Sequence, residues 1–255
     1  MKQLPKDWIN ANISAIYKKG NKSDLSNYRP VSLTSIPCKV MEGFIRDYIL
    51  KHFIDNNLFN NNQYGFLKGR STMLQLLRIL DEWTECLESG GQMNVIYTDF
   101  EKAFDKVSHK LLLDKLHDYK VNESIILWIK SFLCNRKQRV KINGFYSDWA
   151  DVLSGIPQGT ILGPLLFIIS INDLPDVCKQ FVKVFLFADD AKIYKHVITN
   201  DDHQLLQEGL NAFQVWSDRW LLKLNTNKCK ITFYGRDINY DYKYYLSSTD
   251  LEELK

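Results

Sequence analysis

One stretch decides the fold: Val182-Lys183-Val184-Phe185-Leu186-Phe187-Ala188-Asp189-Asp190-Ala191-Lys192-Ile193-Tyr194-Lys195-His196-Val197. Its flanks are rich in β-branched and aromatic residues, which is the composition of β-strands. The break between them is Asp189-Asp190, and Asp tolerates the backbone dihedrals of a tight turn. The sequence therefore predicts an antiparallel hairpin with two adjacent carboxylates at its tip.

The two carboxylates at the tip have two interpretations. Side by side at neutral pH they repel each other, and folding alone gives no reason to place them there. A bound Mg²⁺ would relieve the repulsion, because this ion prefers hard carboxylate oxygens. A solvated polar turn would explain the same dipeptide. The metal hypothesis therefore requires a third carboxylate, phosphate-binding groups and a template groove elsewhere in the chain.

A candidate third carboxylate follows another apolar strand. Residues 93–98 have strand composition and end at Asp99. A carboxylate at the end of a strand is well placed to meet a hairpin tip on a neighbouring strand. Asp105, six residues further on, is either part of the same site or a local cap or salt-bridge residue.

The composition is that of a soluble globular protein. The 255 residues suit one large domain or two small ones, with 45% hydrophobic and 25% charged residues. A net charge of +3 is too weak to indicate a nucleic-acid binder, so any basic surface must be local. Five scattered cysteines favour reduced thiols in an intracellular protein over a disulfide frame or zinc site. The first residues do not resemble a signal peptide, and the longest apolar run is too short to span a bilayer, so no membrane partner is expected.

Hydrophobic periodicity and turn residues predict the remaining elements. Apolar residues at three- and four-residue spacing predict helices over 36–56, 73–87, 109–119, 124–133 and 205–222, and a further helix from Pro164 to about residue 172. Ser71 or Thr72 and Ser108 are the expected N-caps of two of them. Strands are expected at 13–17 and 229–234, and Asn143-Gly144 predicts a second hairpin.

Three basic stretches are candidates for contact with phosphates. Each has an equally simple interpretation as a solvated loop or as an edge strand protected by charge. Their cationic residues are Lys18, Lys19 and Arg29 in the first stretch, Lys68 and Arg70 in the second, and Arg136, Lys137 and Arg139 in the third.

A loop dense in glycine and proline spans residues 154–164. Its glycines let another backbone approach closely, and Gln158 can donate to or accept from a base or sugar. A helix-entry loop without other function rarely needs this pattern. Near the C-terminus, Lys228 is either a general acid for a leaving group or a surface lysine.

Together these motifs resemble the reverse transcriptase domain of non-LTR (LINE-type, jockey-like) retrotransposons. The resemblance extends from about Pro5 to Tyr234. Its carriers, in family order, are Ile16-Tyr17-Lys18-Lys19-Gly20, Tyr28-Arg29-Pro30, Gln63-Tyr64-Gly65-Phe66, Gly69-Arg70-Ser71, Asp99-Phe100-Glu101-Lys102-Ala103-Phe104-Asp105, Gly155-Ile156-Pro157-Gln158-Gly159, Leu162-Gly163-Pro164-Leu165-Leu166-Phe167, Phe187-Ala188-Asp189-Asp190, Leu224-Asn225 and Lys228.

The resemblance implies an α+β right-hand polymerase fold, with a palm of antiparallel strands backed by helices. The fingers would comprise residues 1–92 and 118–150, and the palm residues 93–117 and 151–240. Residues 241–255 would begin the primer-grip region, so the thumb is missing or truncated.

The resemblance also implies a reaction. Asp99, Asp189 and Asp190 would hold two Mg²⁺ ions, with Mn²⁺ as a possible substitute, and the enzyme would add dNTPs to a DNA primer on an RNA template. Lys228 would protonate the departing pyrophosphate.

The same resemblance assigns the nucleotide and strand contacts. Phe104 would pack under the nucleotide sugar and exclude a 2′-hydroxyl. Lys18 or Lys19 would hold the triphosphate together with Arg29. Gln158 and Gly159 would line the template and nucleotide side, and the basic residues of the other two stretches would contact template or primer.

Two other interpretations remain open. The chain is either an active polymerase domain or a truncated relic that only binds RNA or a protein partner. It could also be an intron-encoded or cellular reverse transcriptase. Full elements of the resembled type carry an upstream endonuclease, and their activity is expected in the nucleus, with a possible cytoplasmic ribonucleoprotein stage.

Overall fold

The computed structural model describes residues 4–254 and divides the chain into two compact units. The first unit contains the described residues up to Leu58 together with Phe104–Ser170, and the second contains Phe59–Ala103 and the described residues from Ile171 onward. The expected fingers and palm have other bounds, and they stay a prediction. Residues 59–92 belong with the second unit because their loop and helix pack on its sheet, and residues 104–117 and 151–170 belong with the first.

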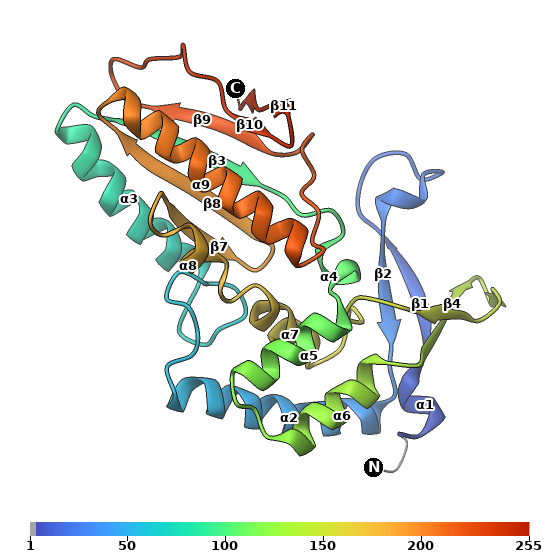
Figure 1. The fold of residues 1–255 in the computed structure, drawn as a ribbon. Helices are drawn as coiled ribbons and strands as arrows, with labels where there is room; N and C mark the ends of the chain where they lie inside the picture. The colour runs from blue at the N-terminus through green and yellow to red at the C-terminus, as the bar shows by residue number, and fades with distance from the viewer. Residues whose placement is uncertain (1–3, 255) are drawn as a thin grey trace. The chain divides into compact units, whose positions relative to one another are not determined.

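The second unit is built on a five-stranded sheet in the order β12-β9-β3-β8-β7 (Figure 1). Its strands are β3 (Gln92–Thr98), β7 (Lys183–Phe187), β8 (Asp190–Val197), β9 (Lys230–Tyr234) and β12 (Glu252–Glu253). The central strand β3 is antiparallel to both β8 and β9, and β7 is antiparallel to β8. The antiparallel hairpin predicted from the sequence is confirmed.

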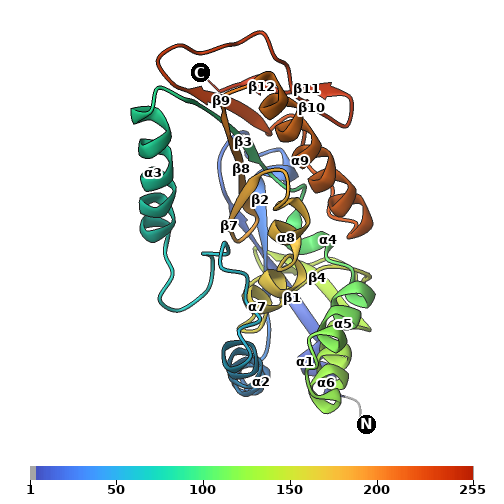
Figure 2. The ribbon, with the colours of Figure 1, turned by 60° about the vertical axis from the view of Figure 1, so that its left-hand side comes forward.

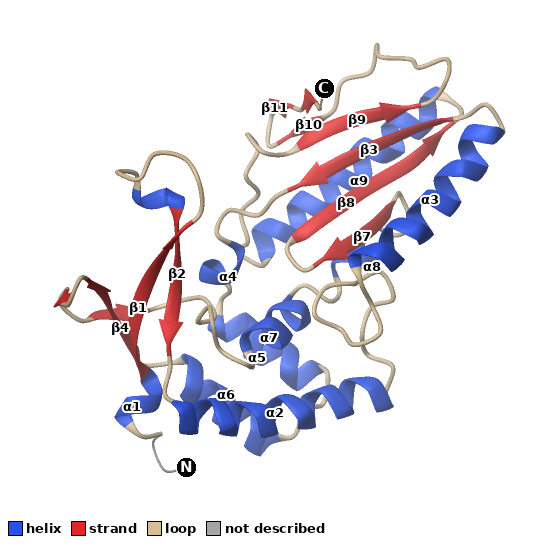
Figure 3. Cartoon of the chain, turned by 180° about the vertical axis from the view of Figure 1, so that it is seen from behind, coloured by secondary structure: helices blue, strands red, loops and turns tan. Residues whose placement is uncertain are grey.

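Helices cover both faces of this sheet. Figures 2 and 3 show α3 (Thr72–Glu88) on one side of the strands and α9 (Asn200–Arg219) on the other, with the short α8 (Leu174–Cys178) near β7. Successive strand residues point to opposite faces, so Met93 and Val95 pack with Trp83 of α3, whereas Asn94 contacts His203 of α9. Antiparallel strands backed by helices are the predicted α+β arrangement.

A buried polar cluster attaches the C-terminal segment to this sheet. The Tyr244 hydroxyl accepts a hydrogen bond from Asn94 Nδ2 at 2.8 Å and is hydrogen-bonded to His203 Nδ1 at 2.7 Å. All three side chains are buried. The segment beyond β9 continues through the short hairpin of β10 (Tyr245–Leu246) and β11 (Thr249–Asp250).

The first unit combines a small sheet with a group of helices. Strand β1 (Asn10–Tyr17) is antiparallel to β2 (Tyr28–Leu33) and parallel to β4 (Arg136–Ile142). The short strands β5 (Phe145–Tyr146) and β6 (Ala150–Val152) pair with β4. Its helical elements are α1 (Lys6–Ile9), η1 (Leu25–Asn27), α2 (Ile36–Asp55), α4 (Ala103–Lys106, which begins at the last residue of the second unit), α5 (His109–Asp118), α6 (Glu123–Leu133) and α7 (Gly163–Ser170).

Local sequence signals set the helix starts. Ser71 Oγ accepts from the N–H of Leu74, and Ser108 Oγ accepts from the N–H of Leu111, so both serines are N-caps. The Asn143-Gly144 hairpin forms between β4 and β5, as expected. Among residues 4–254, no helix has both the length and the apolarity needed to cross a bilayer.

We expect the unit around α9 to be sensitive to a methyl group at Gly209. A Cβ added there would lie 2.6 Å from both γ-carbons of the buried Val182. Gly209→Ala should therefore lower the melting temperature, because overpacking costs about 1–3 kcal/mol. In the control Gly43→Ala no atom lies within 4 Å of the added Cβ, and alanine in a helix should raise stability by about 0.5–1 kcal/mol. Thermal melts that rank the two variants the other way would contradict this packing.

Candidate active site

Two acidic residues far apart in the sequence meet on neighbouring strands. The register of β3 and β8 ends with Thr98 opposite Ala191, so its continuation by one residue would set Asp99 opposite Asp190, and the two carboxylates do interact electrostatically. Directly opposed residues of an antiparallel pair have Cβ atoms about 4.5–5.5 Å apart and point to the same face. The register therefore brings Asp99 to the acidic end of the hairpin.

The tight turn of the hairpin lies one residue earlier than predicted. Phe187 pairs with Asp190, so the turn residues are Ala188 and Asp189, and Asp190 is the first residue of β8. Ala188 has φ +54°, a left-handed conformation that two-residue turns usually give to Gly or Asn. For alanine it costs about 1–2 kcal/mol, so contacts around the turn must hold it. The composition of the stretch could not distinguish these two registers.

The carboxylates influence one another electrostatically. The pKa of Asp190 is raised, first because neighbouring protein removes part of its water and then because Asp189 and Asp99 carry like charge. Lys192 and Lys228 act in the opposite direction and lower it. Partial burial is thus the main cause of the raised pKa, and the neighbouring carboxylates Asp189 and Asp99 add to it.

Lys228 lies against the third carboxylate. Its Nζ donates to Asp99 Oδ2 at 2.9 Å, and both side chains are partly exposed. Backbone bonds fix this approach, since Asn225 N–H donates to the Asp99 carbonyl at 2.8 Å and Glu101 N–H to the Lys223 carbonyl at 2.8 Å. Lys228 is thus both a surface lysine, with its side chain 66% exposed, and a direct neighbour of Asp99, so its role as a general acid stays a prediction.

The donor set fits a divalent cation in its chemistry. Three carboxylates supply hard oxygen ligands, and a cation would neutralise the repulsion that raises the pKa of Asp190. In the arrangement of residues 4–254, no group of three or more His, Cys, Asp or Glu side chains is gathered closely enough to hold an ion. Asp99 is instead neutralised by Lys228, so ion binding would require the Asp99 side chain to leave that ammonium group.

In the first unit the glycine-rich loop of residues 155–159 packs on the segment that follows α4. Gly155 N–H donates to the Val107 carbonyl at 2.8 Å. A Cβ on Gly155 would lie 2.6 Å from the Asp105 carbonyl oxygen, and the residue has φ +86°. Only glycine meets both conditions, which is the close backbone approach that the sequence predicted.

The same loop carries two of the candidate nucleotide contacts. Gln158 Nε2 donates to Asp105 Oδ1 at 3.0 Å, so Asp105 orients Gln158 and serves a local role. Gly159 adopts φ +96°. The half-buried Phe104 ring is stacked on the buried Phe167, with centroids 4.3 Å apart, which limits its rotation.

Strand register distinguishes the two candidate lysines of the first unit. Ile16 lies opposite Arg29, and the pairing continues with a bond from Lys18 N–H to the Asn27 carbonyl at 2.8 Å. Side chains alternate along a strand, so continuation of this ladder puts Lys18 on the face of Ile16 and Arg29, whereas Lys19 lies in the bend beyond β1 and has no register position. Lys18 is thus the better partner of Arg29 for one anionic group.

The structure does not support a template contact for Arg136. Its side chain is 2% exposed, and Nη1 donates to the carbonyls of Trp8 at 3.2 Å and Phe132 at 2.9 Å. The sequence shows a run of cationic residues, but it does not show which of them is buried. Arg136 therefore holds the main chain together and cannot present its charge to a nucleic acid.

The other basic candidates differ in their solvent exposure and in the groups that they contact. Arg70 Nη1 donates to the carbonyls of Asn60 at 2.6 Å and Gln63 at 2.5 Å, so it organises its own loop. Lys68 and Lys137 are exposed, and Lys137 pairs with Asp151 at 3.6 Å. Arg139 is half-buried, and its guanidinium lies over the rings of Tyr146 and Trp149 at 4.0 and 4.5 Å.

Sequence reasoning missed Glu42 as a support of the glycine-rich loop. Glu42 is fully buried, and its Oε2 accepts from the N–H groups of Ile161 at 2.7 Å and Leu162 at 3.0 Å, just before α7. Burial raises its pKa. The sequence did contain a signal for the burial of Glu42. This residue lies one helical turn before Ile45 and two turns before Ile49, on the buried face of α2.

Comparisons with known proteins show which family the chain resembles in sequence. The family model described as reverse transcriptase (RNA-dependent DNA polymerase) matches residues 16–246. The chain is 32% identical over 248 residues to the RNA-directed DNA polymerase from mobile element jockey of Drosophila melanogaster, covering 91% of this chain and 26% of that protein. It is 31% identical over 241 residues to the probable RNA-directed DNA polymerase from transposon BS of the same species, covering 88% of this chain and 26% of that protein. The chain thus spans about a quarter of the length of these relatives.

Solved structures share the fold at low sequence identity. Apo telomerase from Candida tropicalis, truncated from its C-terminal domain, superposes with a TM-score of 0.67 at 13% identity, over 98% of this chain and 55% of that one. Telomerase from Candida albicans, in complex with a fragment of telomeric RNA, gives a TM-score of 0.66 at 12% identity, over 99% and 46%. These likenesses establish the right-hand polymerase fold.

We expect Asp190→Asn to stabilise the protein at neutral pH. A carboxyl with a raised pKa in the folded state favours folding only while protonated, and this contribution is lost as pH rises through the folded pKa. The gain at pH 7 should be below about 1 kcal/mol, because solvent screens the exposed side chain, and it should vanish below the ordinary Asp range. Melting temperatures of wild type and variant at pH 3 and pH 7 measure the difference. A wild type that is the more stable at pH 7 would contradict the electrostatic argument.

Proposed function

The chain belongs to the reverse transcriptase (RNA-dependent DNA polymerase) family, and from this premise we propose that it is the polymerase part of a non-LTR retrotransposon protein. The observation that carries the proposal is the opposed placement of Asp99 and Asp190 by the β3–β8 register. In the proposed reaction the primer 3′-hydroxyl attacks the α-phosphate of a dNTP, and pyrophosphate leaves.

Asp99, Asp189 and Asp190 are the residues that would hold two Mg²⁺ ions, or Mn²⁺ in their place. Bound divalent ions lower the pKa of the attacking hydroxyl and neutralise charge on the triphosphate. The chain's own part is to hold Asp99 and Asp190 at the ends of the neighbouring strands β3 and β8 and Asp189 in the turn before β8, since charge stabilisation and alignment supply most of phosphoryl-transfer catalysis.

Lys228 is proposed as the proton donor to pyrophosphate. Its ammonium group is fixed beside Asp99 by the Asn225 and Glu101 backbone bonds. Lys228 would hold this proton on Nζ until an oxygen of the departing pyrophosphate accepts it. The lysine therefore serves as a counter-ion of Asp99 before substrate binds and as an acid afterwards.

The first unit supplies the proposed nucleotide contacts. Lys18 and Arg29 share a strand face and suit the triphosphate, with Arg29 as a fork and Lys18 as a point charge. Gln158, oriented by Asp105, and Gly159 would border the base and template. Phe104, restrained by Phe167, would pack under the sugar.

The proposed partners follow from the same reaction. An RNA template and a DNA primer would contact the exposed cations Lys68 and Lys137 together with Arg139. Priming from a nicked chromosomal end would place the activity in the nucleus, with an endonuclease elsewhere in the full-length element. Phosphate contacts of this kind are salt-dependent, so binding should weaken as ionic strength rises.

The proposal predicts Mg²⁺-dependent extension of a DNA primer on an RNA template. Substitution of Asp99, Asp189 or Asp190 by Asn should lower the extension rate by at least about 10³-fold, since loss of a metal ligand removes several kcal/mol of transition-state stabilisation. Single-turnover extension measures it. The matched control is Asp81→Asn, an exposed acid on α3 of the same unit, which should extend normally.

The primer-extension rates of wild type, Asp189→Asn and the control variant distinguish an active polymerase domain from a module that only binds RNA. Equal extension by Asp189→Asn and wild type would refute the assignment. Binding of RNA and Mg²⁺ by a wild-type chain that extends no primer would instead support a binding module.

Phe104 should set the choice of sugar. Phe104→Val replaces the ring stacked on Phe167 by a smaller aliphatic side chain, which should lower the preference for dNTPs over rNTPs by at least about tenfold, the scale of steric discrimination in a pocket. The ratio of kcat/KM for dATP and rATP measures this. An unchanged ratio with unchanged dATP use would remove Phe104 from the nucleotide site.

A further inference from the structure

The acidic turn is bonded to a glutamine that the proposed mechanism does not use. Gln63 is fully buried. Its Oε1 accepts from the N–H of Ala188 at 3.0 Å and from the N–H of Gly65 at 2.7 Å. Ala188 directly precedes Asp189, so one side-chain oxygen is tied to the peptide group next to the proposed metal ligands.

The same turn leaves no room for a side chain at residue 65. A Cβ on Gly65 would lie 2.4 Å from the Ala188 backbone nitrogen and 3.0 Å from its Cα. Gly65 does not have a positive φ, so its backbone conformation suits other residues. Contact with the turn is therefore what excludes a side chain there.

Backbone bonds extend this contact along the edge of the sheet. Tyr64 N–H donates to the Leu186 carbonyl at 2.8 Å, and Leu186 N–H donates to the Asn62 carbonyl at 2.9 Å, so Gln63 and Leu186 form a parallel bridge. The segment 62–65 thus pairs with the otherwise open edge of β7, just before the turn.

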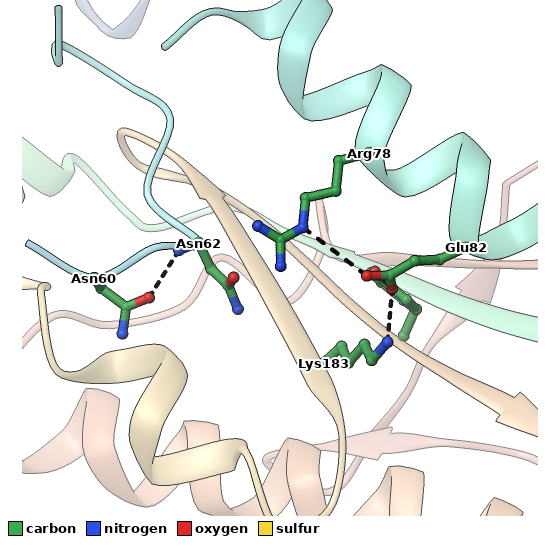
Figure 4. A network of polar contacts seen from close by, with 6 residues as sticks. Asn60, Asn62, Arg78, Glu82 and Lys183 are labelled. Atoms are coloured by element: carbon green, nitrogen blue, oxygen red, sulfur yellow. Dashed lines mark hydrogen bonds and ion pairs between the residues drawn. The ribbon is translucent and has the colours of Figure 1, made fainter. Parts of the chain in front are cut away.

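The segment is itself held firmly in place. Arg70 Nη1 binds the Gln63 carbonyl at 2.5 Å, and Asn60 Oδ1 accepts from Asn62 N–H at 2.9 Å (Figure 4). Figure 4 also shows α3 joined to β7 through Glu82 and Lys183, at 2.8 Å. The loop and the helix both brace the hairpin, one near its tip and the other near its base.

The unused half of the Gln63 amide shows what the side chain supplies. Gln63 Nε2 is buried without a hydrogen-bond partner, and a buried unsatisfied donor destabilises a fold. An apolar side chain of similar length would fill the space without that loss. The two bonds accepted by Oε1 are therefore the distinct contribution of glutamine at this position.

We propose that Gln63 and Gly65 are positioning residues that hold the Ala188–Asp189 turn and so set the place of the Asp189 and Asp190 carboxylates. The proposal rests on the proposed polymerase function for its consequence in catalysis. Gln63 Oε1 restrains the left-handed Ala188 by accepting from the Ala188 N–H. The absence of a side chain at Gly65 allows the loop of residues 62–65 to approach Ala188. Neither residue touches substrate.

The deciding experiment compares two buried glutamines of the second unit in the 255-residue chain. Gln63→Met removes the acceptor and keeps the length of the side chain. Gln75→Met makes the same chemical change in α3, where Gln75 is 1% exposed. Both variants are checked by thermal melting, and Asp189→Asn serves as the loss-of-ligand reference.

Two activity-related readouts separate positioning from general stability. Gln63→Met should lower kcat for primer extension by at least about tenfold with KM for primer–template unchanged, since small misplacements are costly to alignment. Its Mn²⁺ dissociation constant, measured by electron paramagnetic resonance, should rise about tenfold or more, as for other residues behind metal ligands. Gln75→Met should match wild type in both. Equal values in the two methionine variants would overturn the proposal.

A second variant guards against a failure to fold. If Gln63→Met is unfolded, Gly65→Ala tests the same contact, because its methyl group displaces the Ala188 nitrogen. Gly43→Ala, with open space around its Cβ, is the control. Normal kcat and Mn²⁺ affinity in a folded Gly65→Ala protein would also overturn the proposal.

Hydrogen exchange distinguishes failure of this proposal from failure of the polymerase function. The Ala188 N–H is protected by Gln63, so a peptide spanning residues 184–191 should exchange faster in Gln63→Met than in Gln75→Met. If wild type neither extends a primer nor binds Mn²⁺, the polymerase function fails. Exchange then decides alone: faster exchange in Gln63→Met supports the restraint of the turn, and unchanged exchange refutes it.

Discussion

The structure depends on the antiparallel pairing of β3 with β8. Within residues 4–254, no other strand pairing joins the end of β3 to the start of β8. Asp99 directly follows β3, and Asp190 is the first residue of β8. A shift by one residue would send one of the two carboxylates to the other face of the sheet. The packing of α3 against Met93 and Val95, and of α9 beyond Asn94, makes such a shift costly. Hydrophobic burial on both faces thus maintains an arrangement of charges that electrostatics alone would oppose.

That opposition is visible in the raised pKa of Asp190. Like charges close together reduce stability, and functional sites commonly carry such local costs while the surrounding fold supplies the excess. Here the counter-ion Lys228 offsets part of the repulsion by binding Asp99. Strain in the left-handed Ala188 is a second local cost, and it lies in the same turn. Both costs fall on residues at the tip and not on the buried strands behind it.

Much of the secondary structure could be predicted because its causes are local. Ser71 and Ser108 cap helices through their own backbone neighbours, and Asn143-Gly144 forms a turn through its own dihedral preferences. Long-range effects were predicted less well. In α2, Ile45 and Phe53 are buried whereas Phe44, which obeys the same helical spacing, is exposed. Arg136 carries the same charge as Lys137 but lies beneath the surface, because the partners that desolvate it come from distant segments.

Residue types and their order were enough to reveal an acidic dipeptide between strands, a third acid after a strand, and a set of motifs in an order that identifies the family. These features depend on residue types and on short-range conformational preferences, so they can be identified without knowing the tertiary contacts. The turn register at Ala188–Asp189, the burial of Arg136 and the contact of Gln63 with the turn became known only from the folded structure. Each of these depends on which distant segments pack together, and packing energy is shared among residues that the linear sequence does not bring side by side.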